Sequence, residues 1–130
     1  MIEQTAFEIT TWDYKAFSRP VEETESILNE VSLDVMKKRN SQKKGIAVRF
    51  TSHFTFENEK ILEFSGEHSY VIDFEDVIDE NELIKMIRNS YQMFKEKFDF
   101  KKLSTTLQNR SLQSLNENDI NMDGILPMLM

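Results

Sequence analysis

Apolar and polar side chains alternate along three segments in the first part of the chain. Residues 27–35, 46–57 and 62–75 each place most of their apolar residues on one parity and their polar residues on the other. Such a period of two predicts β-strands that bury one face. Glu57-Asn58-Glu59 predicts a hairpin turn, and the lysine-rich residues 37–44 predict another. An earlier segment, from Phe7 to Phe17, loses its alternation at Trp12 and predicts a less regular first strand.

The hydrophobic period changes to that of a helix near Asp79. One stripe with helical spacing begins there and contains Leu83, Ile84, Ile87, Tyr91 and Phe94. Asp79 stands three residues before Glu82, which is the spacing of a helix N-cap. A kink is expected near Asp99, and the helical spacing continues through Phe98, Leu103 and Leu107. Residues 116–119 predict a loop, and residues 125–130 form a short apolar tail.

The order of these elements predicts one α+β domain over residues 1–130, with strands from about 5 to 75 and a helical region from about 80 to 130. The expected sheet is four-stranded and antiparallel, with helices packed on one face. The expected inward-facing side chains are Val31, Leu33, Val35, Val48, Phe50, Phe54, Phe64, Ile72, Phe74, Ile87 and Tyr91.

Composition narrows the possible functions. The chain has 39% hydrophobic residues and no cysteine, so it can build one core but no disulfide, thiol nucleophile or cysteine-bound metal site. A net charge of −7 disfavours general nucleic-acid binding. No apolar run is long enough to cross a membrane, and residues 1–4 do not resemble a signal peptide. We therefore expect a soluble, cytoplasmic protein with no membrane insertion.

The sequence contains no pattern of catalytic residues. His53 and His68 fall on opposite strand parities, so they are not expected to share a metal. Neither a glycine-rich phosphate loop nor a nucleophile elbow occurs. We expect a protein that is not an enzyme and that uses no metal or cofactor.

The apolar residues exceed what one sheet and one helix layer are expected to hide. Flexible apolar volume comes from Met36, Met86, Met93, Met122, Met128 and Met130. This surplus predicts a homo-oligomer, adaptable binding of partners, or both. The candidate contacts between copies are Tyr91, Phe94 and Phe98.

Several segments resemble the SecB family of export chaperones. Residues 30–35, Glu-Val-Ser-Leu-Asp-Val, are similar to the family's E-V-x-L-D-L strand, and residues 46–56 and 61–74 stand where the family has its next strands. Residues 115–126 are similar to the family's L-N-L-x-P-(I/V)-N-F-x-x-L segment, which precedes its last helix. The resemblance covers most of the chain, in the family's order of elements, and implies a SecB-like four-stranded α+β fold that assembles as a homotetramer.

The resemblance also implies a function. SecB proteins are ATP-independent holdases that bind unfolded, export-competent polypeptides in apolar grooves and pass them to the motor protein SecA. By resemblance, the client-binding candidates are Leu112, Leu115, Ile120, Met122, Phe17 and Val21. An acidic outer face for partner docking is implied at Glu30, Asp34, Glu63 and Glu67.

The sequence departs from the family at three places. Residues Lys15–Pro20 lack two acids that help dock SecA, and Glu63 and Ser65 replace a leucine and a glutamate that serve the same contact. These differences count against SecA docking. Asp119 replaces a proline, and the chain ends soon afterwards, so the final helix is expected to be very short or absent.

Two other functions fit the same residues. One is a dedicated chaperone or interaction partner of a single protein, as in toxin–antitoxin systems. The other is a carrier of a small lipophilic ligand in a cavity between the sheet and the helices. A general holdase protects several unrelated unfolded proteins, whereas a dedicated partner protects only one.

Overall fold

The computed structural model describes residues 2–4, 6–15, 27–39, 44–72, 78–105, 107–108, 110–115 and 120–129. Within these residues the strands are β1 (Ile2–Gln4), β2 (Glu8–Tyr14), β3 (Leu28–Arg39), β4 (Lys44–Phe56) and β5 (Glu59–Ile72). They are followed by helix α1 (Glu80–Lys101), the 3-10 turn η1 (Lys102–Ser104) and helix α2 (Met122–Leu129). Phe74, one of the expected core residues, lies outside the described residues.

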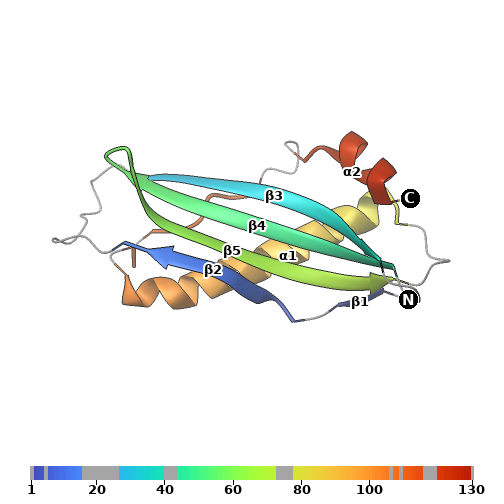
Figure 1. The fold of residues 1–130 in the computed structure, drawn as a ribbon, viewed down its shortest axis with the longest axis horizontal. Coiled ribbons are helices and arrows are strands. Elements are labelled where there is room, and N and C mark those ends of the chain that lie inside the picture. The colour runs from blue at the N-terminus through green and yellow to red at the C-terminus, as the bar shows by residue number, and fades with distance from the viewer. Residues whose placement is uncertain are drawn as a thin grey trace.

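The strands form one antiparallel sheet in the order β1-β5-β4-β3 (Figure 1). β1 pairs with residues 70–72 of β5 and β2 pairs with residues 62–67, so the two follow one another along the same edge. The layer is therefore four strands wide, and β3 forms its other edge. This arrangement confirms the predicted α+β class with a four-stranded antiparallel sheet. The final helix, which was expected to be very short or absent, is present as the eight residues of α2.

A β-bulge explains why the alternation fails in the first strand. The pairing of β2 with β5 shifts register between Ile9 and Thr11. One extra residue moves the following side chains to the other parity. Ile9 before the bulge, and Trp12 and Tyr14 after it, consequently all pack against the core.

The turn between β4 and β5 has the predicted position. Glu57 and Asn58 have φ angles of 53° and 65°, and Phe56 pairs directly with Glu59. Positive φ at both central residues belongs to the two-residue hairpin turn that matches the twist of the flanking strands. The predicted hairpin is therefore confirmed.

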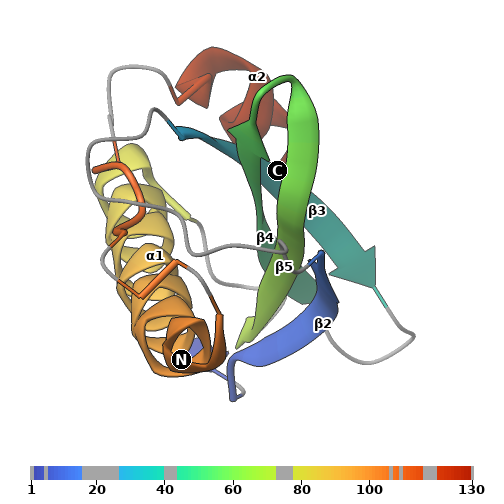
Figure 2. The same ribbon diagram turned by 90° about the vertical axis from the view of Figure 1, so that its left-hand side faces the viewer.

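Helix α1 covers one face of the sheet (Figures 1 and 2). As predicted, Asp79 caps the helix, because its side chain accepts a hydrogen bond of 2.8 Å from the Glu82 N–H. The helix runs unbroken past Asp99, and the change of path expected there comes only where η1 begins. Leu103 lies in this tighter turn and is 62% exposed, so the expected continuation of the buried stripe is wrong at that residue.

Aromatic rings of α1 stack on aromatic rings of the sheet. The ring centroid of Phe64 lies 4.5 Å from that of Phe94 and 5.3 Å from that of Phe98. Phe50 lies 5.0 Å from Tyr91 and 5.5 Å from Phe94. All five side chains are buried, so these contacts form the centre of the core.

This packing corrects the expected role of Tyr91, Phe94 and Phe98. Their side chains are 5%, 0% and 0% exposed, and the sheet of the same chain covers them. They leave no surface for a contact between copies, so the prediction that they form an oligomer interface is wrong. The helical period identified a buried face, but the partner of that face is the chain's own sheet.

Some apolar surface remains outside this core. The large apolar side chains that are exposed in the described part of the chain are Leu28, Phe100 and Leu103. Among the same residues, no helix has the length and apolar character needed to cross a membrane.

Phe50 provides a direct test of the core. Because its side chain is fully buried, Phe50→Ala is expected to lower the free energy of unfolding by about 3–5 kcal/mol. Phe100→Ala removes the same group from a position that is 78% exposed and is expected to change stability by less than about 0.5 kcal/mol. Urea denaturation measures both values. Equal losses in the two variants would show that Phe50 does not lie in the core.

Candidate functional site

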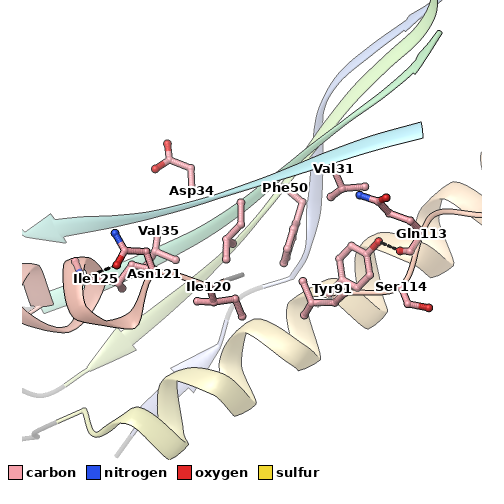
Figure 3. A pocket seen from close by; sticks show the side chains of 13 residues that line it. Val31, Asp34, Val35, Phe50, Tyr91, Gln113, Ser114, Ile120, Asn121 and Ile125 are labelled. Atoms are coloured by element: carbon pink, nitrogen blue, oxygen red, sulfur yellow. Dashed lines mark hydrogen bonds between the residues drawn. The ribbon is translucent and has the colours of Figure 1, made fainter. Parts of the chain in front are cut away.

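An open groove of about 550 Å³ lies between β3, α1 and residues 113–115 and 120–125 (Figure 3). Inward-facing residues of β3 form one side, residues 113–115 and 120–125 form the other, and Phe50 and Tyr91 lie between them. Asp34 is the one charged residue among the described lining residues. The groove is lined by Val31, Leu33, Asp34, Val35, Phe50, Tyr91, Gln113, Ser114, Leu115, Ile120, Asn121, Gly124 and Ile125.

The groove exists because β3 is only partly covered. Val31 and Leu33 on β3 are half-buried, whereas Val48 and Phe50 on the neighbouring β4 are completely buried. Helix α1 packs against β4 and β5. Residues 113–115 and 120–125 approach β3 instead, and they leave the apolar side chains of β3 accessible from one side.

β3 also presents an open strand edge beside the groove. All of its residues from Leu28 to Arg39 pair with β4 without a register shift, and the described sheet contains no strand on its other side. An edge strand turns alternate N–H and C=O groups away from its neighbour, where they can pair with another chain. β3 contains no proline and no bulge. Both features commonly prevent another strand from pairing with a sheet edge, so neither of them prevents pairing here.

Hydrogen bonds hold the far wall of the groove. The Tyr91 hydroxyl donates to the Gln113 C=O, drawn as a dashed line in Figure 3. Burial raises the pKa of Tyr91 to about 12, so this hydroxyl keeps its proton at neutral pH. At the start of α2, the Asn121 side chain accepts from the Gly124 N–H at 3.1 Å, and the Asn121 C=O accepts from the Ile125 N–H at 3.0 Å. Tyr91 of α1 therefore holds Gln113, and the Asn121 hydrogen bonds order the first turn of α2 itself.

Two of the predicted client-binding residues line the groove. Leu115 and Ile120 are half-buried in its wall. Leu112 is 5% exposed and packs into the core, so it anchors the segment rather than facing the groove. Met122 packs against the core from α2 but does not belong to the groove lining. Outside the described residues lie Phe17 and Val21.

The predicted acidic face of the sheet is partly neutralised by its neighbours. The Glu67 carboxylate lies 3.3 Å from the Arg49 guanidinium, and the Glu63 carboxylate lies 3.3 Å from the Lys60 ammonium. Both glutamates are half-buried. The exposed carboxylates of the predicted set are those of Glu30 and Asp34. The face is thus less acidic than the sequence alone indicates.

A second polar cluster is enclosed between β5 and α1. His68 Nδ1 lies 3.1 Å from Ser90 Oγ, and the Tyr70 hydroxyl lies 2.8 Å from the same oxygen. All three side chains are buried, as the apolar parity of His68 predicts, and none of them lines the groove. Across the described ranges, no three His, Cys, Asp or Glu side chains gather as potential metal ligands.

Two residues that support the groove do not follow the apolar pattern of their strands. Asn29 occupies an inward position of β3 between Ile27 and Val31, and Ser52 interrupts the inward apolar residues of β4 in the same way. Asn29 Nδ2 donates to Ser52 Oγ at 2.8 Å. A polar residue at an inward position of each of two paired strands was the sequence signal that could have identified them.

Comparisons with known proteins place the fold. No protein-family model matches the sequence, and no curated protein matches it significantly. A SecB-like chaperone from Mycobacterium tuberculosis, solved in complex with a ChAD peptide from the HigA1 antitoxin, matches with a TM-score of 0.56 and 10% identity, over 88% of this chain and 90% of that chain. A protein of unknown function from Streptococcus agalactiae matches with a TM-score of 0.47 and 12% identity, over 89% of this chain and 97% of that chain. The first likeness shows a SecB-like fold, in agreement with the order of elements in the sequence.

The buried Tyr91 hydroxyl predicts a loss of stability in alkaline solution. Its pKa is raised from 10.0 to about 12 in the folded chain, whereas an exposed tyrosine in the unfolded chain ionises at about 10. Between these values the unfolded chain has lost this proton and the folded chain has kept it. The free energy of unfolding therefore falls as the pH rises through this range. The fall is expected to be shallower in Tyr91→Phe. Denaturant titrations across this range compare the two proteins, and equal slopes would contradict the burial of the hydroxyl.

Proposed function

We propose that the protein is an ATP-independent holdase chaperone that binds extended segments of unfolded polypeptides in the groove beside β3. The observation that carries this proposal is an open strand edge beside a groove into which apolar side chains of β3 project. An extended polypeptide can use both, because its backbone pairs with the edge while alternate side chains enter the groove. A small lipophilic molecule can use the groove alone.

The spacing along β3 suits such a segment. Val31, Leu33 and Val35 stand two residues apart, which corresponds to steps of about 6.6 Å along a strand. A client strand alongside β3 repeats this spacing and places its own apolar side chains between β3 and the opposite wall. Leu115, Ile120 and Ile125 meet them there.

The groove favours extended apolar sequence rather than one particular shape. Backbone pairing with an edge strand does not depend on the identity of the client's side chains, and the aliphatic residues among the groove lining accept many apolar side chains. The net charge of −7 keeps a loaded complex in solution. These properties support binding of several different unfolded clients.

A dedicated role is the second candidate. The SecB-like chaperone from Mycobacterium tuberculosis is bound to an antitoxin peptide. That observation supports a polypeptide ligand, and it fits a chaperone that serves one protein as well as a general holdase. Transfer to SecA in protein export has less support, because two acids of the family's docking site are missing in Lys15–Pro20.

The proposal includes a homo-oligomer, a dimer or a tetramer, that acts in the cytoplasm without nucleic-acid or membrane partners. Its interface has to lie outside the buried aromatic stripe of α1. Contiguous exposed apolar surface marks protein contacts, and Phe100 and Leu103, three residues apart in the sequence, are both exposed at the end of α1 and in η1. They are therefore better candidates for a contact between copies than the aromatic stripe.

Replacing Leu115 and Ile120 together by serine tests the groove. Both side chains are half-buried in its wall, so the double variant is expected to fold while losing apolar contact with the client. We expect at least about fivefold weaker suppression of client aggregation. Ile84→Ser removes a half-buried aliphatic side chain of α1 that does not line the groove, and it serves as the matched control. Light scattering from chemically unfolded clients diluted into buffer measures the effect.

The outcomes separate the candidate functions. Lost protection with an unchanged circular dichroism spectrum and an unchanged oligomeric state supports the groove, and unchanged protection would refute it. Protection of several unrelated clients by the wild type supports a general holdase, whereas protection of a single client supports the dedicated role. Binding of a fluorescent fatty acid without any binding of polypeptide would favour the lipophilic carrier.

A further inference from the structure

One wall of the groove continues into a segment that crosses between α1 and β3, and we call residues 110–115 the strap. Near α1, Lys102 Nζ donates to the Arg110 C=O at 2.8 Å, and Leu112 is buried in the core. Ser114 and Leu115 then enter the groove lining. The position of the strap therefore determines the position of this wall.

Gln113 in the strap is held from both sides. Its N–H donates to Asn29 Oδ1 on β3 at 3.0 Å, and its C=O accepts from the Tyr91 hydroxyl on α1. Sheet and helix are thus both tied to the backbone of one residue. Because Leu115 follows two residues later, a displacement of Gln113 displaces the groove lining.

Asn29 is itself fixed by its hydrogen bonds. Its Nδ2 donates to Ser52 Oγ at 2.8 Å and to the His53 C=O at 3.2 Å. These partners determine the orientation of the amide, since a flipped amide would turn its NH2 group toward the Gln113 N–H and its oxygen toward the His53 C=O. An apolar side chain, which the pattern of β3 favours at this position, would satisfy none of these groups.

We propose that Asn29 is a positioning residue of the groove, which sets the distance between the strap and β3 and hence the width available to a bound segment. This inference rests on the proposed polypeptide binding. A purely structural role would be to stabilise the start of β3. The two roles have different consequences, because positioning affects the strap amides and client affinity, whereas a structural defect weakens the whole fold.

Three variants distinguish these roles. Asn29→Leu keeps the approximate volume and removes every hydrogen bond, while Asn29→Asp keeps an oxygen that can accept from the Gln113 N–H. Thr55→Val changes the outer face of the neighbouring strand β4, away from the groove and from residues 31–35, and is the matched control. Amide hydrogen exchange is measured in the strap and in α1. Affinity is measured by fluorescence anisotropy with labelled, reduced and carboxymethylated α-lactalbumin, which is permanently unfolded.

In Asn29→Leu, exchange of the strap amides and the Kd for the unfolded probe are each expected to rise about tenfold, while α1 amides keep their protection. Thr55→Val is expected to stay within about threefold of the wild type in both measurements. Asn29→Asp is expected to fall between Thr55→Val and Asn29→Leu, because it keeps the acceptor for the Gln113 N–H but turns a second oxygen toward the His53 C=O. If Asn29→Leu does not fold, Asn29→Ser takes its place, because the serine hydroxyl is too short to reach Gln113.

Three results would overturn the inference: unchanged strap exchange, faster strap exchange with an unchanged Kd, or equal acceleration in the strap and in α1. The proposed function fails separately, if the wild type does not bind the unfolded probe. In that case the exchange measurement still decides whether Asn29 holds the strap.

Discussion

The stacking of α1 on β4 and β5 determines where the rest of the chain has to pack. A helix is about 10 Å across, and neighbouring strands are about 4.8 Å apart, so one helix covers about two strands. The sheet is four strands wide, and the rings of Phe94 and Phe98 direct the helix over its centre. Both edges of the sheet therefore need another cover. On one side Trp12 packs against Phe64 under the Lys101 side chain, and on the other side the strap and α2 approach β3.

The cover over β3 differs in kind from the core. Stacked aromatic rings hold α1, whereas hydrogen bonds with Asn29 and Tyr91 hold Gln113 of the strap, and apolar side chains of α2 pack against the core. Hydrogen bonds keep the strap in a fixed position without close packing of its side chains against the sheet, because each bond fixes the distance between two groups. Val31 and Leu33 stay half-buried as a result. Apolar surface that a closed core would hide is therefore accessible along β3.

Much of the fold could be predicted from the sequence, because its signals are local. Alternation located β3, β4 and β5, and Asp79 with Glu82 located the start of α1. The bulge in β2 could not be predicted, since the break in parity at Trp12 does not reveal how the pairing with β5 shifts. The helical stripe that contains Tyr91 was correctly predicted to be apolar. Periodicity shows which face of a helix is buried, but it does not show which other surface covers that face.

The groove was harder to predict, because it depends on contacts between distant segments. Leu112 and Leu115 are both leucines in one irregular segment, yet one is an anchor and the other lines the groove. No local pattern distinguishes them. Asn29 carried a signal, as a polar residue at an inward position, but its partner Gln113 lies more than eighty residues away in the chain. Resemblance to the SecB family pointed to a segment that contributes residues to the groove, but it did not distinguish anchoring residues from lining residues.

Nuclear magnetic resonance titration of the isotope-labelled protein with a permanently unfolded polypeptide tests the central claim most directly. If the groove beside β3 binds extended clients, the largest changes in amide shifts will occur at residues 31–35 of β3 and at residues 113–115 and 120–125 across the groove. Slower exchange of β3 amides on the open edge will accompany them. Changes confined to the outer face of the sheet or to the exposed end of α1 around Phe100, with none along β3, would contradict the account.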